Sequence, residues 1–397
     1  MACAATCPGS SNRLLHSKIM TSPHPYFHRI AWLAVGLAVC VILFGAFVRL
    51  SNAGLSCPDW PTCYGKATWP TATADVAAAN VAFPERMVES HKTWREQFHR
   101  HIAALLGVLV LSLALLAARH RRAGLLTVMS ASALVAASIP AYIATHYLFA
   151  FGLAGSGLTL LLVAAVRWDD RDLSRISATT LAVIIIQAML GMWTVTWLLK
   201  PVVVMAHLLG GLTTLSLLLW MAWRSTPEAR LLSAHSLALR GWAWLGLGLL
   251  AVQIALGGWV SANYAALACG TDFPTCLGQW WPTTDFSEGF VMWRGIGVDY
   301  EGGVLDSAAR SAIHLVHRLF AVLVAAYLCA LAWRLLKAPG LAGWAWLLLA
   351  ATTAQVVLGI SNVVFGLPLW VATLHTAGAV VLLATLVSLL ARLRSSI

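Results

Sequence analysis

The stretch EQFHR at residues 96–100 stands at the start of a long apolar run, and HLVHR at residues 314–318 stands at the start of another. Both stretches place a histidine, His99 or His317, directly before an arginine. Two such matches in one chain indicate that the sequence contains two copies of one structural unit. The copies divide the chain into an N-terminal and a C-terminal half.

A second pair of matching stretches follows the first. QAMLG at residues 187–191 leads to His207, and QVVLG at residues 355–359 leads to His375. The glutamines and the histidines are separated by the same 168 positions (355 − 187 and 375 − 207). Each half thus has a histidine on each of two apolar helices, an arrangement by which a helical membrane bundle can hold an iron porphyrin from both faces.

The composition excludes an ordinary soluble domain, because 60% of the 397 residues are hydrophobic, 10% are charged and the mean hydropathy is +0.79. Runs of roughly 20 apolar residues recur, the length that a helix needs to cross about 30 Å of hydrocarbon. We therefore predict an all-α polytopic membrane protein. Its spans, about ten in number, are expected near residues 29–50, 98–119, 123–144, 147–167, 176–198, 201–223, 241–262, 313–334, 343–366 and 368–391.

The loop charges predict the orientation of these spans. With the N-terminus inside, the arginines and lysines of the short loops fall on the inner side, and the long loops 51–97 and 263–312, which hold most of the acidic residues, fall outside. Residues 1–28 then form a cytoplasmic leader, and residues 225–240 form a cytoplasmic linker. The formal net charge of +11 reflects this orientation and contact with anionic lipid, not nucleic-acid binding.

Each outer loop has two cysteines a few residues apart, Cys57 and Cys63 in the first and Cys269 and Cys276 in the second. In an oxidising outer compartment, the expected state is a local disulfide in each loop, Cys57–Cys63 and Cys269–Cys276. Free thiols and a redox-active pair are the alternatives. A four-cysteine zinc site is disfavoured because the two pairs belong to separate copies.

Residues 123–167 break the match between the halves. After Lys337 the C-terminal half has a short loop before its glutamine-containing helix, whereas the N-terminal half has about 45 largely apolar residues in the same place. We interpret this segment as an inserted helical hairpin. It crosses the membrane twice and so preserves the orientation of everything that follows it.

Four of the 13 histidines occupy matched positions. At about 1.5 Å per residue, two of them lie roughly 9–10 Å from their helix starts, and the other two lie near the outer ends of their helices. We expect them to be metal ligands in pairs, with haem iron between two imidazoles in the outer part of the membrane. A copper site and a proton relay are alternatives, and the lack of carboxylates or thiolates inside the spans disfavours zinc and di-iron carboxylate sites. The four are His99, His207, His317 and His375.

Three arginines lie close to these histidines. Arg100 and Arg318 directly follow two of them, and Arg49 ends the first span. Each arginine is expected to pair either with a haem propionate or, by snorkelling, with lipid headgroups.

An acidic residue distinguishes the two halves. Glu96 lies three residues before His99, on the same helical face, whereas the second half has His314 in that place. A carboxylate beside one site and not the other indicates that the first site does chemistry and the second carries electrons. The alternative is a surface acid that is favoured by a helix N-terminus.

At these residues the chain resembles the haem A synthase family. The resemblance covers nearly the whole chain from about residue 29, and the combination of motifs is specific. The matching features are RLSNAGL at residues 49–55 followed by PDWP at 58–61, W-x-E-x-x-H-R at 94–100, LGMWTV at 190–195, and the histidines at 207 and 375.

The resemblance implies two pseudo-symmetric four-helix bundles from an internal repeat. The N-terminal, catalytic bundle would occupy residues 29–224, and the C-terminal bundle, which holds haem b, residues 241–394. Members of the family have eight helices, so the hairpin at 123–167 is a departure from the family pattern.

The resemblance further implies an oxidoreductase that converts a methyl group of haem O to a formyl group through an alcohol, giving haem A for terminal oxidases. His99 and His207 would flank the substrate haem, with Glu96 as the catalytic carboxylate. His317 and His375 would hold a permanent haem b as the cofactor. The long isoprenoid tail of haem O suits a bundle that a substrate can reach sideways from lipid.

We expect the protein in the bacterial cytoplasmic membrane, with both termini in the cytoplasm and the cysteine loops outside; the mitochondrial inner membrane is the alternative. The expected partners are haem O synthase, terminal oxidase assembly factors, an electron-transfer partner and membrane lipid, and the sequence is compatible with a homo-oligomer. The competing functions are a di-haem transmembrane electron-transfer cytochrome and a haem chaperone. A transporter is disfavoured because the repeats share one orientation and lack buried carboxylates.

Overall fold

The computed structural model describes residues 26–226 and 236–393, and within these ranges every regular element is helical apart from two isolated β-bridges. Ten of the described helices are long and apolar enough to cross a membrane, which confirms the predicted all-α architecture. Most of the predicted leader and linker lies outside the described residues. The helices are α1 (Phe27–Leu50), α2 (Thr73–Ala82), α3 (Ser90–Ala118), α4 (Gly124–Ile143), α5 (Tyr147–Arg167), α6 (Ser174–Thr196), α7 (Pro201–Ser225), α8 (Ser236–Ala262), α9 (Phe286–Gly289), α10 (Ser307–Leu336), α11 (Ala342–Val364) and α12 (Leu369–Arg392).

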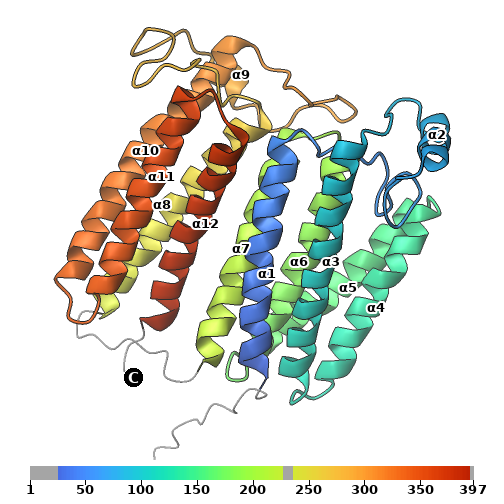
Figure 1. Cartoon of the computed structure of the whole chain (residues 1–397). Helices are drawn as coiled ribbons and strands as arrows, with labels where there is room; N and C mark the ends of the chain where they lie inside the picture. Colours follow the sequence, from blue (N-terminus) through green and yellow to red (C-terminus); the bar gives the residue numbers. More distant parts are fainter. Residues whose placement is uncertain (1–25, 227–235, 394–397) are drawn as a thin grey trace, which may run out of the picture.

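Two four-helix bundles stand side by side (Figure 1). In the first bundle, α1 and α6 each pack against both α3 and α7. In the second bundle, α8 and α11 each pack against both α10 and α12. The order of neighbours is the same in both bundles, which supports the predicted internal repeat.

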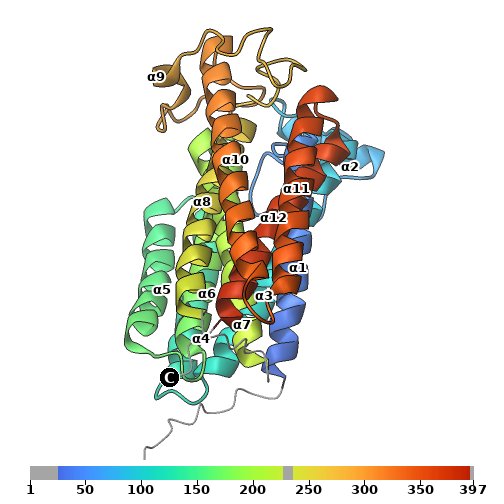
Figure 2. The same ribbon diagram turned by 90° about the vertical axis from the view of Figure 1, so that its left-hand side faces the viewer.

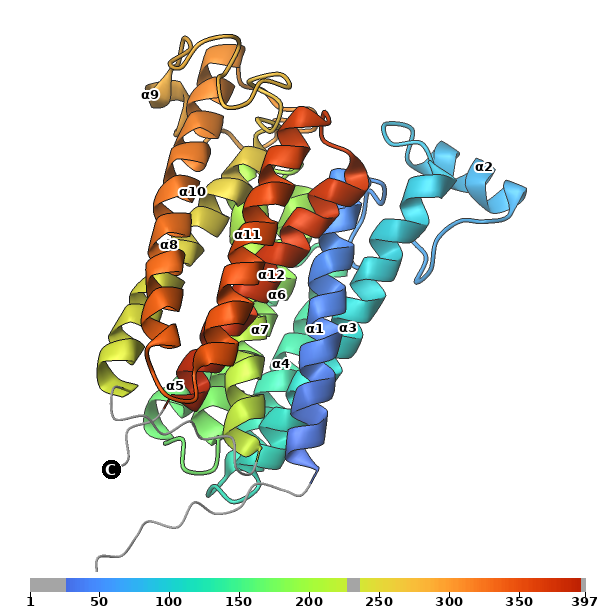
Figure 3. The same ribbon diagram turned by 60° about the vertical axis from the view of Figure 1, so that its left-hand side comes forward.

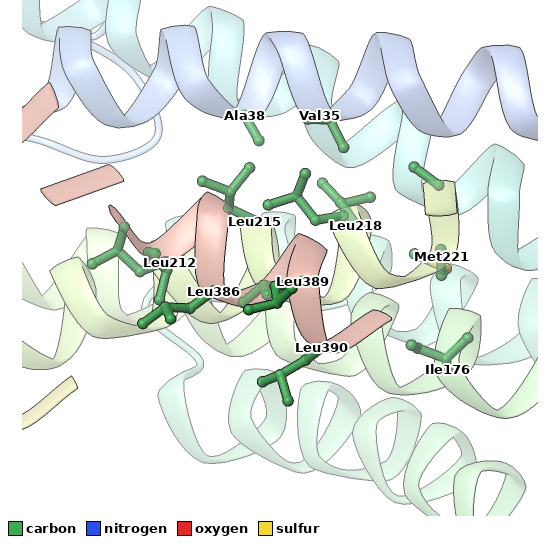
Figure 4. Packing of buried hydrophobic residues seen from close by; sticks show 14 of the residues in the cluster. Val35, Ala38, Ile176, Leu212, Leu215, Leu218, Met221, Leu386, Leu389 and Leu390 are labelled. Atoms are coloured by element: carbon green, nitrogen blue, oxygen red, sulfur yellow. The ribbon is translucent and has the colours of Figure 1, made fainter. Parts of the chain in front are cut away.

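The bundles meet through α7 and α12, with further contacts from α12 to α1 and from α7 to α8. Figure 4 shows Leu215 and Leu218 of α7 close to Ala38 of α1, with Leu389 of α12 beside them. Lipid is as apolar as these side chains, so the junction depends on close van der Waals packing. The small side chains of Ala34 and Ala38, fully buried on α1, allow that close approach.

The long connections gather at one end of both bundles, which we call the loop face. It is formed by residues 51–89 and 263–306 and includes the short helices α2 and α9 (Figure 3). The start of α1 and the end of α12 lie at the opposite end (Figure 1). The two cysteine-containing loops therefore share one end of the molecule, as the loop charges require.

Helices α3 and α10 begin well before the predicted spans, at Ser90 and Ser307. Their first turns are polar, so hydropathy assigns them to the loops, but Asp306 caps α10 by accepting a hydrogen bond from a backbone N–H of the first turn (2.8 Å). His99 and His317 consequently lie nine and ten residues inside their helices. The prediction that they lie near helix ends was wrong for this reason.

Helices α4 and α5 form the predicted hairpin. They pack on each other, with α4 against α3 and α5 against α6, so the hairpin covers the seam between α3 and α6. Figure 2 shows α5 on the outside of the first bundle, beside α6. The two helices approach closely, since a Cβ on Gly157 would lie 2.6 Å from the Ala131 carbonyl oxygen. In the second bundle α10 passes to α11 through the short turn 337–341.

Arg121 connects the two turns at the base of this hairpin. It donates hydrogen bonds from Nη2 to the Asp169 carboxylate (2.6 Å), and its Nε lies 2.8 Å from the Asp172 carboxylate. Burial by itself raises the pKa of Asp172, but hydrogen bonds from Arg121 and Ser174 lower it below its ordinary value overall.

We expect Arg121→Ala to lower the thermal midpoint by about 1–3 °C at pH 7. The fold lowers the pKa of Asp172, so the Arg121–Asp172 pair contributes fully to the free energy of unfolding above the ordinary pKa of about 4. This contribution is lost as the pH falls through the lowered pKa. The difference from the native protein should therefore shrink at pH 3. Thermal scans at both pH values measure it, with the more exposed Arg171→Ala as the control, and an equal difference at both pH values would contradict the assignment.

Candidate functional site

The predicted histidines form two pairs, one in each bundle. His99 of α3 and His207 of α7 both lie against glycines of α1 and α6 in the first bundle, and His317 of α10 and His375 of α12 both lie against glycines of α8 and α11 in the second. The helices of a pair are both packed against the same two neighbours. A ligand between the two imidazoles would therefore lie inside the bundle.

The two pairs lie at matching depths below the loop face. The α3 and α10 histidines are nine and ten residues from their helix starts, and the α7 and α12 histidines are six residues from theirs. These separations correspond to about 14–15 Å and about 9 Å along the helices. The similar depth of the two pairs agrees with the repeat inferred from the sequence.

Each histidine rests on a glycine of the neighbouring helix. A Cβ built on these glycines would lie 2.7–3.1 Å from the Cε1 atom of the imidazole opposite. A larger residue would displace the imidazole, so the glycines set its place. The pairs are Gly45 with His99, Gly191 with His207, Gly257 with His317 and Gly359 with His375.

Glutamines lie beside three of the four histidines. Gln187 donates to the His207 carbonyl oxygen (2.7 Å). Nε2 of Gln253 lies 3.1 Å from Nδ1 of His317, and Nε2 of Gln355 lies 3.4 Å from Nε2 of His375. Gln253 and Gly257 were not among the predicted site residues, although QIALG at 253–257 repeats the pattern of QAMLG at 187–191 and QVVLG at 355–359.

These residues fit an iron porphyrin. Paired imidazoles inside an apolar bundle are suitable ligands for its iron, and Nδ1 of three of the histidines is buried without a hydrogen-bond partner. Among the described residues, no group of three or more His, Cys, Asp or Glu side chains could hold a metal ion without help from such a ligand. The unpartnered atoms belong to His99, His207 and His375.

Glu96 is buried against the first cysteine loop. Its carboxylate accepts hydrogen bonds from the Cys57 N–H (2.8 Å), the Ser56 hydroxyl (3.1 Å) and the Arg100 guanidinium (2.5 Å). Glu96 lies one turn from His99, as predicted, but protein groups engage both carboxylate oxygens. The carboxylate is thus part of the connection between α3 and the loop.

Arg100 and Arg318 hold the two cysteine loops to their helices. Arg100 donates to the carbonyl oxygens of Asp59 (2.8 Å) and Thr62 (2.7 Å), and Arg318 donates to the matching carbonyl oxygens of residues 272 and 275 (2.9 Å each). Both guanidinium groups are therefore occupied by loop carbonyls. The expectation that they pair with propionates or headgroups stays a prediction, and Nε of Arg318 is buried without a hydrogen-bond partner.

Arg49 makes a contact between the bundles. It donates to the Ser261 carbonyl oxygen at the end of α8 (2.8 Å) and lies 4.3 Å from the centre of the Tyr264 ring. Its Nε is buried without a partner. Of the three predicted propionate partners, Arg49 joins the halves and the other two join loop to helix.

Both predicted disulfides are present, Cys57–Cys63 and Cys269–Cys276. All four cysteines are at most 1% exposed, so soluble thiols do not reach the sulfur atoms in this fold. The Asp59 carboxylate folds the first loop by accepting hydrogen bonds from the Tyr64 and Gly65 N–H groups (2.6 and 2.9 Å). Burial indicates that the disulfides are structural.

A segment of the second half closes the loop face over the first bundle. Tyr300 is 1% exposed, packs with Leu55 and Leu199, and donates its N–H to the Leu198 carbonyl oxygen (3.1 Å). Arg86 of the first loop pairs with Glu301 (2.8 Å). The two halves are therefore joined outside the helices as well as between them.

An aromatic cavity of about 580 Å³ lies between the hairpin and α6, and it contains none of the predicted site residues. Trp193 lines it, two residues after Gly191, so it points about 200° around α6 from the glycine under His207. Tyr142, Tyr147 and Phe151 of the hairpin line the other side. The cavity is separated from the first histidine pair by α6.

Comparison with known proteins identifies the family. The COX15-CtaA profile, described as cytochrome oxidase assembly protein, matches residues 28–387. A haem A synthase of Shewanella oneidensis is 38% identical over 91% of this chain and 96% of its own length. A haem A synthase of Caulobacter vibrioides is 31% identical over 53% of this chain and 60% of its own length. The chain therefore belongs to the COX15-CtaA family of cytochrome oxidase assembly proteins, the haem A synthase family that its motifs predict.

Proposed function

We propose that this chain is a haem A synthase, which oxidises a methyl group of haem O to a formyl group through a hydroxymethyl intermediate. The observation that carries the proposal is one histidine pair inside each bundle, at matching depth, in a membrane protein of this family. The relative that is similar over most of its length has the same name. A bound iron porphyrin supplies the redox chemistry, which side chains alone do not provide.

We assign the first pair to the substrate. His99 and His207 would hold haem O between α3 and α7. Glu96, one turn from His99, would accept protons that the methyl group releases during oxidation. Its hydrogen bonds to Ser56 and Arg100 link that carboxylate to the loop face.

The second pair is assigned to electron transfer. His317 and His375 would hold haem b as the permanent cofactor. The residue that matches Glu96 is His314, whose Nδ1 is engaged with the Ala265 carbonyl oxygen (2.8 Å). The lack of a carboxylate at this position supports a carrier role for the second site.

The ten long apolar helices within the described residues make this an integral membrane protein. We place it in the bacterial cytoplasmic membrane, with the loop face outside and both termini in the cytoplasm, as the loop charges favour. A haem O synthase would supply the substrate, and terminal oxidase assembly would use the product. The family description as cytochrome oxidase assembly protein supports this use.

The test is haem extraction and chromatography from membranes that contain this chain together with a haem O supply. We expect haem A or its hydroxymethyl precursor, and neither in membranes without the chain. Bound haem b with unchanged haem O, in folded protein with its electron partner present, would favour the di-haem cytochrome or haem chaperone instead.

A further inference from the structure

The glutamines beside the histidines are unevenly distributed. Gln187, Gln253 and Gln355 each stand four residues before the glycine on which a histidine rests. In α1 the residue four before Gly45 is Val41. The first histidine pair therefore has one glutamine, at His207, and the second pair has two.

A histidine that binds iron through one ring nitrogen usually donates its other ring N–H to an acceptor, which fixes the imidazole and raises its basicity. Gln253 Nε2 lies 3.1 Å from His317 Nδ1, and the Gln253 Oε1 has no partner. A half-turn of this amide lets Oε1 accept the Nδ1–H hydrogen bond, in exchange for the hydrogen bond that Nε2 donates to the His317 carbonyl oxygen (3.2 Å).

The other two glutamines contact their histidines differently: Gln187 Nε2 donates to the His207 carbonyl oxygen (2.7 Å), and Gln355 Nε2 lies 3.4 Å from His375 Nε2. Oε1 of Gln187 and of Gln355 is buried and unpartnered, as is Nδ1 of His207 and of His375. A rotated Gln355 amide would present its Oε1 to the Nε2–H of His375 and leave Nδ1 for iron, whereas Gln187 holds its histidine through the backbone. The apolar side chain of Val41 offers no acceptor to His99.

We propose that the three glutamines are positioning residues that strengthen the binding of iron by their histidines, and that Val41 leaves His99 the weakest of the four ligands. This inference rests on the proposed function. It predicts that the porphyrin of the first site exchanges and that the porphyrin of the second site stays bound. A site that takes in substrate and delivers product must release its porphyrin. The site with one glutamine would do so, and the site with two would retain its haem.

A packing role for the glutamines makes a different prediction. Gln187 and Gln355 also lie over Gly210 and Gly378, where an added Cβ would come within 2.2 and 2.1 Å of Oε1. Glutamines that only fill this space would affect thermal stability and leave porphyrin dissociation unchanged. The rate of dissociation therefore distinguishes the two roles.

The experiment is haem transfer from the purified full-length protein, saturated with ferric protoporphyrin IX, to excess apomyoglobin, followed by visible absorption. The native protein should lose haem in two phases, the fast phase from the first site. Val41→Gln should slow the fast phase by about tenfold and leave the slow phase unchanged. Val41→Met, of similar length but without an acceptor, should change neither phase.

A second arm keeps the test decisive if Val41→Gln does not fold. Gln355→Met should accelerate the slow phase by about tenfold. The proposal is overturned by an unaltered fast phase in folded Val41→Gln, by equal slowing in Val41→Met, or by an unaltered slow phase in Gln355→Met. Failure of the native protein to bind haem in either site would instead refute the proposed function.

Discussion

Replacing His375 with alanine should abolish the low-spin haem absorption of the second site. Two imidazoles are needed for a six-coordinate, low-spin haem, and alanine leaves His317 alone opposite an empty position beside Gly359. His317→Ala should have the same effect. Visible spectra and haem content of the purified protein measure the loss.

The matched control for this experiment is His146→Ala. His146 is exposed next to the start of α5 and has no counterpart in the second half, so its removal should leave the spectrum unchanged. Thermal scans show whether each variant is folded. A native low-spin spectrum in folded His375→Ala would exclude His375 as a ligand.

Glu96→Gln should stop haem A formation while haem remains bound. The amide keeps the size of the side chain and an oxygen for the Cys57 N–H, which lies 2.8 Å from the carboxylate, but it cannot take up a proton near neutral pH. General-base catalysis contributes about 10²–10⁴-fold, so we expect the rate to fall by that factor. Haem extraction measures product, and spectra measure retained haem.

Ser56→Ala is the control for Glu96→Gln. It removes one hydrogen bond to the carboxylate (3.1 Å) and leaves the carboxylate itself in place, so a much smaller loss of activity is expected. Equal losses in both variants would show that the loop geometry, not the carboxylate, is required. Normal haem A output from Glu96→Gln would remove Glu96 from the mechanism.

Hydropathy and charge predict the helices well because the bilayer demands long apolar segments with internal hydrogen bonds. They predict helix ends poorly where a helix continues beyond the apolar run. The turns from Ser90 and Ser307 are polar and still helical, since packing on the loops and a cap at Asp306 stabilise them. The inserted hairpin was predictable because only one half has the extra apolar residues.

The histidines were predictable because the repeat gives each one a counterpart. The glycines beneath them were only partly predictable, since Gly45 lacks the glutamine that marks the other three. The roles of Arg100 and Arg318 depend on how the cysteine loops fold, and no local pattern reveals that loop carbonyls at Asp59 and Thr62 end within 2.8 Å of a guanidinium. Long-range partners of this kind require the structure.

The hairpin also affects how a membrane-dissolved molecule reaches the first bundle. Lipid on that flank meets α4 and α5 before it meets the seam between α3 and α6. At the seam between α1 and α3, residues Trp94 and Phe98 are 37% and 41% exposed. The Phe44 ring centre lies 5.1 Å from that of Phe98 and 6.5 Å from that of His99. On this flank, which the hairpin leaves uncovered, we expect a flat molecule with a long apolar tail to approach His99 past these aromatic side chains.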